Sequence, residues 1–211
     1  GGPDREKIFA ADLIVKSPGI AEKAPLIKEL RAAGKEIVSE IEFGYWYKGE
    51  SKIIAITGSN GKSTTTSLLY HLLHDAVLDV SMVGNIGISF AKQVALKPTA
   101  WYVMEISSFQ LDDIKDFRPD IGVLLNITPD HLDRYDYKFE NYIASKFRIA
   151  RNQEADDLLI VNTDDPEIKA YLAENLLKPK LIPITMSENN LTQDEGAFMK
   201  DEELHLKYKG D

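Results

Sequence analysis

The stretch KIIAITGSNGKST, residues 52–64, decides the fold. Its first part, Lys52–Thr57, is apolar and β-branched, which predicts a buried strand. Its second part, Thr57–Thr64, sets glycines before a Lys-Ser-Thr run where a helix is expected to start. Backbone amides at such a turn can approach phosphate oxygens, and the helix N-terminus adds partial positive charge. Although Ile56 stands where the common G-x-x-x-x-G-K-[ST] pattern has its first glycine, we interpret the stretch as a phosphate-binding loop rather than a helix cap with a surface lysine.

Apolar runs and helical patterns alternate beyond this loop. Such alternation predicts an α/β fold with a mostly parallel sheet flanked by helices. Further strands are expected over Asp79–Val83, Trp101–Ile106, Ile121–Ile127, Leu158–Asn162 and Leu181–Thr185. Expected helices include Phe139–Arg151, Glu167–Leu177 and Ser63–Leu73, the last with Leu68, Leu69 and Leu72 on one side. The final pair of runs, Ala197–Lys200 and Leu204–Tyr208, predicts a hairpin appended to the sheet.

The residues before the loop predict a separate, smaller unit. Short strands are expected over Ala11–Val15 and Glu36–Ser39, with a helix over Ala24–Ala33 between them. A helical stretch with three aromatic residues follows and leads to the polar, glycine-containing segment Lys48–Lys52, which is typical of a linker. We therefore expect one domain over residues 1–48 and a second over residues 49–211.

Composition limits the possible partners. The chain has 211 residues, with 25 basic and 34 acidic side chains for a formal net charge of −9. An acidic balance argues against nucleic acid as a partner, because a phosphate backbone prefers a basic surface. Since no apolar run reaches the roughly 18 residues that cross a bilayer, no membrane partner is expected. The absence of cysteine excludes disulfides and thiolate metal sites and fits a reducing compartment.

Polar side chains follow two more of the expected strands. Glu105 ends one strand, and an acidic residue at that end, beside a phosphate-binding loop, can hold Mg²⁺ directly or through water. The segment Asn126–Tyr135 packs Asp, His, Asp and Arg behind the next strand. Standing alone, Glu105 would be interpreted as a solvated strand end and His131 as a structural residue. Their place at the ligand edge of the sheet favours a site role for both, with His131 as a metal ligand or polar anchor.

Lys146 lies on an apolar stripe of an expected helix. Phe139, Ile143, Lys146 and Ala150 are spaced by four, three and four residues, so they share one helix face. A lysine there must snorkel to water, find a partner or lose its charge. Two interpretations stay open: a snorkelling side chain, or a neutral amine that reacts with carbon dioxide to give a metal-binding carbamate.

Five motifs in this order resemble the ATP-dependent Mur ligase family, which builds the peptide of bacterial cell-wall precursors. They are Thr57–Thr64, Gly84-Asn85-Ile86-Gly87, Glu105-Ile106-Ser107-Ser108, Asn126–Asp133 and Lys146. The continuations Phe109-Gln110-Leu111 and Arg134-Tyr135 are most similar to the branch that adds D-glutamate. The resemblance implies a family central domain preceded by part of a Rossmann-like, UDP-substrate-binding domain. It also implies an amide ligase that adds D-glutamate to UDP-N-acetylmuramoyl-L-alanine through an acyl phosphate, in peptidoglycan synthesis.

The resemblance also implies roles for single residues. The ATP-binding residues would be Gly58, Ser59, Asn60, Gly61, Lys62, Ser63 and Thr64, with Lys62 on the outer phosphates. Two Mg²⁺ ions are implied, one held by Ser63 and Glu105 and one by His131 and a carbamylated Lys146. Lys62, His131 and Lys146 would be catalytic. The muramoyl-peptide substrate would be placed by Asn85, Ser107 and Gln110, and its uridine end by Ser17, Pro18 and Gly19.

The family's organisation adds expectations about the whole protein. The chain is expected to be a fragment, inactive alone, because the opening strands of the first domain and a C-terminal domain would lie outside it. A monomeric, cytoplasmic enzyme of cell-wall biogenesis is implied, acting on small molecules and linked to cell shape and division. Two alternatives stay open: another Mur-type or folylpolyglutamate-like ligase, and a nucleotide-binding module without ligation. The segments Ser107–Gln110 and Asp130–Arg134 disfavour the folylpolyglutamate type, and a nucleotide-binding module has no use for Lys146 on an apolar stripe.

Overall fold

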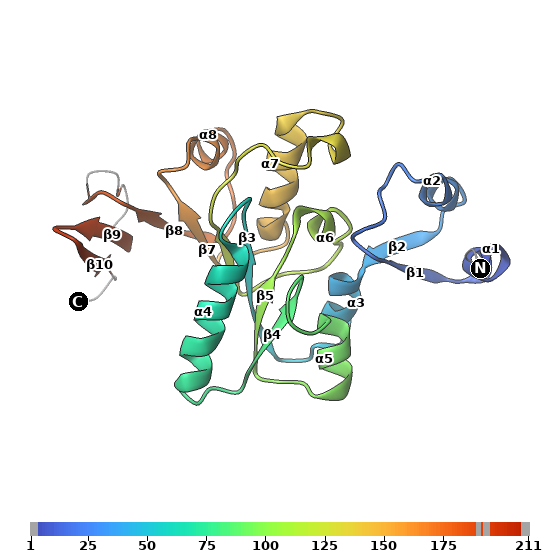
Figure 1. Ribbon diagram of the computed structural model, residues 1–211, viewed down its shortest axis with the longest axis horizontal. Helices are drawn as coiled ribbons and strands as arrows, with labels where there is room; N and C mark the ends of the chain where they lie inside the picture. Colours follow the sequence, from blue (N-terminus) through green and yellow to red (C-terminus); the bar gives the residue numbers. More distant parts are fainter. Residues whose placement is uncertain (1–3, 189–190, 192–194, 208–211) are drawn as a thin grey trace.

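The central sheet carries the elements that follow the phosphate loop. In the residues that the computed structural model describes, 4–188, 191 and 195–207, it has eight strands in the order β10-β9-β8-β7-β6-β3-β5-β4. All neighbouring strands are parallel except β9 and β10. The strands are β3 (Lys52–Thr57), β4 (Val80–Gly84), β5 (Trp101–Glu105), β6 (Ile121–Leu124), β7 (Leu158–Asn162), β8 (Lys180–Thr185), β9 (Gly196–Lys200) and β10 (Glu203–Lys207). The predicted α/β class is confirmed, and α1 (Arg5–Ala10) and β10 lie at opposite ends of an elongated body (Figure 1).

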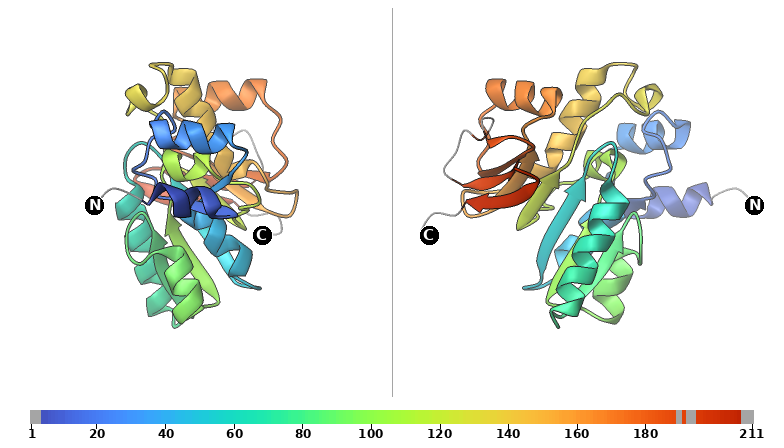
Figure 2. Two further views of the ribbon diagram at one scale, coloured as in Figure 1. Left: turned by 90° about the vertical axis from the view of Figure 1, so that its right-hand side faces the viewer. Right: turned by 60° about the vertical axis from the view of Figure 1, so that its left-hand side comes forward.

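Helices cover both faces of this sheet because the strands are apolar on both sides. Alternation along β3 sends Ile53 and Ala55 to one face and Ile54 and Ile56 to the other. The second face is covered by α4 (Lys62–Asp75). The first face is covered by α3 (Glu40–Tyr47), α5 (Phe90–Leu96), α6 (Ser108–Asp112), α7 (Phe139–Phe147) and α8 (Pro166–Glu174). Figure 2 shows α4 apart from α7 and α8, with strands of the sheet between them.

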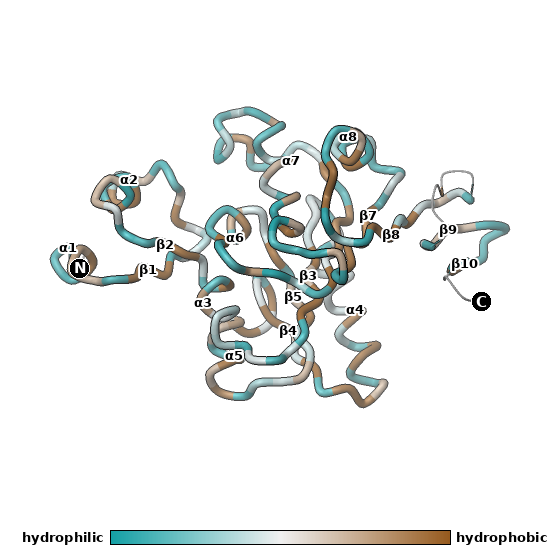
Figure 3. Tube along the Cα trace, turned by 180° about the vertical axis from the view of Figure 1, so that it is seen from behind, coloured by the Kyte–Doolittle hydropathy of each residue, from teal (hydrophilic) through white to brown (hydrophobic). Residues whose placement is uncertain are grey.

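The predicted orientation of α4 is wrong in part. Leu69 packs on the sheet, but Leu68 and Leu72 are 59% and 60% exposed. The side of α4 that faces the sheet instead carries Thr66, which is fully buried, Leu69 and Leu73. Because one sheet-facing position is a threonine, the positions of the leucines alone do not reveal which side of α4 faces the sheet. Figure 3 shows hydrophobic stretches along α4 as well as along the strands.

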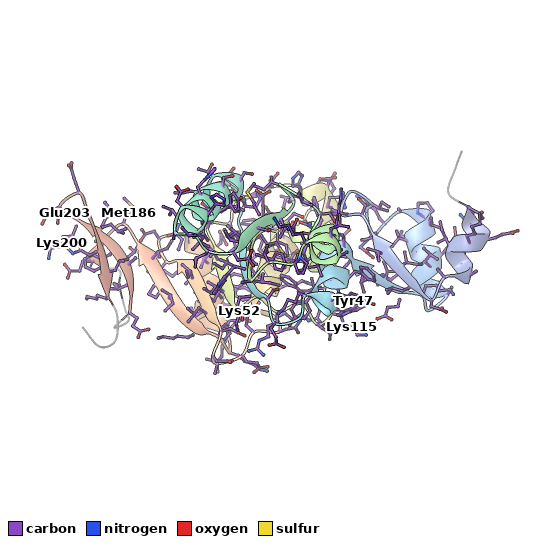
Figure 4. All side chains as sticks on the ribbon, turned by 90° about the horizontal axis from the view of Figure 1, so that it is seen from below. Tyr47, Lys52, Lys115, Met186, Lys200 and Glu203 are labelled. Carbon is purple, nitrogen blue, oxygen red and sulfur yellow. The ribbon has the colours of Figure 1, made fainter. Side chains whose placement is uncertain are left out.

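A small unit precedes the central sheet. It contains α1 (Arg5–Ala10), β1 (Leu13–Lys16), α2 (Pro25–Ala32) and β2 (Glu36–Ser39), with β1 and β2 paired in parallel. The next helix, α3, starts at the N-cap Ser39 and sends Ile41 into the core of the central sheet. The Glu42 carboxylate, fully buried, accepts the backbone amides of residues 115, 116 and 117 at 2.8–2.9 Å, which fixes α3 to the loop after α6. Figure 4 labels Tyr47 and Lys115 beside this junction.

Most predicted elements are confirmed, with shifts at their ends. The helix expected over Phe139–Arg151 is α-helical to Phe147 and then tightens to a 3₁₀ turn over Arg148–Ala150. The strand expected over Ile121–Ile127 stops at Leu124, because the next residues turn toward the phosphate loop. The hairpin is present, and Tyr208 at its predicted end lies outside the described residues. None of the helices in the described residues is both long and apolar enough to cross a bilayer.

Candidate active site

The phosphate loop, Glu105 and His131 follow the carboxyl ends of three adjacent strands, β3, β5 and β6, and Lys146 reaches the same edge from α7. β3 is paired with β5 on one side and β6 on the other, so the loops after these strands meet at one edge. A pocket of about 320 Å³ opens there. It is lined by Pro18, Gly19, Lys62, Asn85, Ser107, Ser108, Phe109, Asp130, His131, Tyr142 and Lys146.

The phosphate loop is held from two sides. Gly61, the N-cap of α4, has a φ of 81°, a left-handed conformation that glycine adopts without strain. Lys62 folds back so that its Nζ donates to the carbonyls of Gly58 and Ser59, both at 2.9 Å. The amide of Asn60 donates to the side chain of Asn126 at 2.8 Å, and Asn126 donates back to the Asn60 carbonyl at 3.0 Å. The loop is therefore preformed, with the Lys62 amine at its rim.

Glu105 joins two of the predicted motifs. Its carboxylate, 1% exposed, accepts the Ser63 hydroxyl at 2.6 Å and the Asn85 amide at 2.7 Å. Asn85 reaches it because Gly84, with a φ of 103°, packs directly against the Glu105 carbonyl, where any Cβ would collide. The structure thus brings Ser63, Asn85 and Glu105 together as three hydrogen-bonded side chains.

His131 stands on the loop after β6 in a strained conformation. Its φ of 50° is left-handed, which is uncommon outside glycine. The imidazole is largely exposed, with Nε2 at 3.6 Å from Asp130 Oδ2 and the ring at 5.2 Å from the Phe109 ring. Its free edge and its place in the pocket leave it able to bind a ligand.

Lys146 is buried, so the snorkelling interpretation is wrong. The residue is 2% exposed, and its Nζ donates to the Gly58 carbonyl at 2.8 Å and lies 4.6 Å from the centre of the Tyr142 ring. Burial, aided by the charge of Lys62, lowers the pKa of Lys146 to about 7. A substantial fraction of the amine is therefore neutral near neutral pH, the state that can attack carbon dioxide.

Donors suited to Mg²⁺ lie at this edge. Mg²⁺ keeps several waters and takes one or two protein oxygens together with phosphate oxygens. The Ser63 hydroxyl and the Glu105 carboxylate, 2.6 Å apart, fit one such ion. Within the described part of the chain, no three His, Cys, Asp or Glu side chains are grouped to hold a metal. A second ion beside His131 would therefore need another oxygen donor, which a carbamate on Lys146 would supply.

Two predicted substrate residues, Ser17 and Gln110, do not line the pocket. Ser107 and Gln110 bond to each other as a capping box on α6, and Gln110 is buried behind the pocket while Ser107 lines it. Pro18 and Gly19 line the pocket, but Ser17 does not.

Sequence reasoning missed several residues of the site. Tyr142 lines the pocket without having been predicted, and so do Ser108, Phe109 and Asp130, which stand in the quoted motifs but were given no role. Tyr142 donates to or accepts from the Ser59 hydroxyl at 3.1 Å, and so ties the phosphate loop to α7. Its spacing of four from Lys146 on the same helix was a signal that could have marked it.

The chain is similar in sequence to proteins of one family. The family described as Mur ligase middle domain matches residues 56–210. The UDP-N-acetylmuramoylalanine-D-glutamate ligase of Christiangramia forsetii is 50% identical over 198 residues, which is 94% of this chain and 44% of that protein. The same-named ligase of Bacteroides thetaiotaomicron is 49% identical over 208 residues, covering 98% and 46%. The chain therefore spans about half the length of these relatives.

Solved structures give the same fold. A UDP-N-acetylmuramate:L-alanyl-gamma-D-glutamyl-meso-diaminopimelate ligase from Neisseria meningitides matches 93% of this chain and 64% of its own with a TM-score of 0.62 at 17% identity. A MurF ligase from Thermotoga maritima, solved in complex with ADP, matches 95% and 54% with a TM-score of 0.56 at 18% identity.

Proposed function

We propose, since the chain belongs to the Mur ligase family, that it is the ATP-binding part of a ligase that joins D-glutamate to UDP-N-acetylmuramoyl-L-alanine. One observation carries the proposal: Lys62, the Ser63–Glu105 pair, His131 and Lys146 meet at the edge of the sheet where the parallel strands end. Relatives that are half identical over nearly the whole chain bear the name of that ligase, which supports the choice of substrates.

The proposed reaction begins with an anion approaching an anion. A substrate carboxylate attacks the γ-phosphorus of ATP, the bond from that phosphorus to the bridging oxygen breaks, and ADP leaves. The amine of D-glutamate then attacks the acyl phosphate, loses a proton and releases inorganic phosphate as the amide forms. Lys62 would move from its loop carbonyls to the outer phosphate oxygens, where its charge stabilises the transferred group.

The remaining site residues would hold the Mg²⁺ ions and orient the phosphate groups. Ser63 and Glu105 would ligate one Mg²⁺, and His131 with a carbamylated Lys146 would ligate another. Bound Mg²⁺ supplies positive charge to phosphate oxygens. For the carbamate, the neutral Lys146 nitrogen attacks the carbon of carbon dioxide and its proton passes to solvent, so a buried amine becomes an anion with hard oxygen donors.

The substrate would lie across the pocket from the phosphate loop. Pro18 and Gly19 would contact the uridine end, and Asn85 with Ser107 would contact the muramoyl peptide. Ser17 and Gln110 would act from behind, through the turn and through the α6 cap. This assignment makes residues 1–48 part of a UDP-substrate domain and residues 49–211 the ATP domain. The monomeric state and the cytoplasmic location stay predictions.

An assay of the complete gene product tests the proposal. ADP release is measured with UDP-N-acetylmuramoyl-L-alanine and D-glutamate, with a folate and L-glutamate, and without an acceptor. We expect turnover in the first mixture only, together with an amide product by mass spectrometry. Turnover with the folate would establish the alternative ligase, and ADP release in all three mixtures would establish a nucleotide-hydrolysing module.

A further inference from the structure

The loop that carries His131 is strained beyond that residue. Asp136 and Tyr137 also have left-handed φ values, both 56°, so three non-glycine residues of residues 131–137 are strained. Such conformations persist only where the surroundings over-determine them. The contacts that hold this loop therefore decide where His131 stands.

Two of those contacts come from the N-terminal unit. The Arg134 Nη2 donates to the carbonyl of Pro18 at 3.2 Å, across 116 residues of sequence. The Lys23 Nζ donates to the carbonyl of Asp133 at 2.6 Å. A lysine and a main-chain carbonyl of the segment after β1 thus fix the His131 loop in place.

Arg134 also holds the wall of the pocket. Its guanidinium lies over the Phe109 ring at 4.3 Å from the ring centre, and the same ring also neighbours the rings of His131 at 5.2 Å and Tyr135 at 6.0 Å. Pro18, Phe109 and His131 line the pocket, whereas Arg134 does not. The partners of the Arg134 guanidinium in the described residues are thus a carbonyl and an aromatic face.

We infer that Arg134 is a positioning residue that couples the Pro18–Gly19 turn to His131. This inference rests on the proposed function, because it needs a nucleotide-sugar at the turn and phosphoryl transfer beside the histidine. A guanidinium can donate from its edge and stack through its face at once, and an ammonium cannot. Occupation of the turn would then fix Phe109 and His131 for the reaction at the other end of the pocket.

Steady-state kinetics of an Arg134→Met variant of the complete gene product test the coupling. We expect the KM for UDP-N-acetylmuramoyl-L-alanine to rise about fivefold, because the turn loses its brace, and kcat to fall about tenfold, because His131 is misplaced. The KM for ATP should stay within about twofold, because the phosphate loop is held by Asn126 and not by Arg134. A variant that is merely less folded would lose kcat with both KM values unchanged.

Two further variants make the result specific. Arg151→Met removes an arginine that also donates to a backbone carbonyl, that of Ile114 at 3.3 Å, away from the pocket, and should leave all constants unchanged. Arg134→Lys can restore the bond to Pro18 without the flat stack on Phe109. It should recover the KM for the UDP substrate while kcat stays low.

Hydrogen exchange separates this inference from the proposed function. Amides of residues 131–138 should exchange faster in Arg134→Met than in Arg151→Met, whether or not ligation is detected. An active wild type with an unchanged Arg134→Met variant, or equal exchange in the two variants, would overturn the coupling alone. A wild type that fails to ligate would overturn the proposed function, and the exchange experiment would still decide the role of Arg134 in the loop.

Discussion

At Lys146 the fold places a primary amine where an ammonium group is poorly solvated. Its hydrogen-bond acceptor among the described residues, the Gly58 carbonyl, is shared with Lys62, so removal of Lys146 leaves that carbonyl satisfied. Burial is the larger cause of its lowered pKa, and the charge of Lys62 adds to it. Lys146 therefore destabilises the fold when no ligand is bound, and the size of this destabilisation depends on pH.

We predict that Lys146→Met stabilises the chain, and most strongly at or below pH 7. The unfolded lysine keeps its proton up to its ordinary pKa of 10.5, whereas the folded one releases it near 7. Between these values the unfolded state binds more protons, so wild-type stability rises with pH and the advantage of the variant shrinks. In urea unfolding in bicarbonate-free buffer, the free energy of unfolding of Lys146→Met should exceed that of wild type by roughly 2–4 kcal/mol at pH 6. This difference should fall toward zero by pH 10. Lys138→Met, at an exposed lysine that caps the same helix, should show no such trend, and a pH-independent difference for Lys146→Met would contradict a depressed pKa.

Lys62 tests the chemistry rather than the stability. In the part of the chain that the structure describes, its amine bonds to carbonyls of its own loop alone, so Lys62→Ala should leave the fold intact. Loss of a charge that acts on the transferred phosphoryl group costs on the order of 10²-fold or more in turnover. We expect that loss in the ADP-release assay of the complete gene product, with Lys92→Ala on α5 as the control. Wild-type turnover in Lys62→Ala would remove the phosphate-loop assignment.

At the scale of an element, α4 ends against the preference of its sequence. The amide of Val77 donates to His74 and that of Leu78 to Leu73, the two bonds of a Schellman motif. Val77 occupies its left-handed position with a φ of 62°, where glycine is the usual residue. The side chain is 90% exposed, so it returns no packing energy for the strain.

Val77→Gly should therefore stabilise the chain. The relief is about 1 kcal/mol, reduced by the greater freedom of glycine in the unfolded state. The neighbouring Ala76→Gly is a matched control, because Ala76 has an ordinary φ of −76° and gains nothing. Thermal unfolding should show opposite signs for the two variants. A loss of stability in both would mean that the strain at Val77 is absent in solution.

Elements and site residues differed in how far the sequence could predict them. The positions of the strands and of the residues at their ends were predictable, although the strand order was not. A run such as Trp101–Ile106 is apolar because it is buried on both faces of the sheet. The meeting of Ser63 with Glu105 followed, since parallel strands present their carboxyl ends at one edge. The hydrogen bond from Arg134 to Pro18 could not be predicted from the sequence, because it joins two residues that share no local pattern.

At the scale of the whole molecule, one carboxylate fastens the N-terminal unit to the central sheet. Asp113, directly after α6, accepts Lys16 Nζ of β1 and Arg31 Nη2 of α2, both at 2.8 Å. The Lys16 and Asp113 side chains are only 4% and 2% exposed. Glu22 contacts both cations from the solvent side. Since the pocket takes Pro18 and Gly19 from this unit, the network also keeps the site closed on that side.

Asp113→Asn should loosen the N-terminal unit before the rest of the chain. Removing the Asp113 charge leaves Lys16 and Arg31 with the half-exposed Glu22 as their remaining anionic partner in the described residues, at a cost of at most roughly 3 kcal/mol. Because β1 pairs only with β2 in the described residues, amides of Leu13–Lys16 should lose protection in hydrogen exchange while those of β5 keep theirs. Asp116→Asn is the control and should change neither, because the exposed Asp116 carboxylate accepts the Trp46 indole and no other side chain in the described residues. Equal loss of protection in β1 and β5 would show that the two units unfold together and that the network stabilises the molecule as one body.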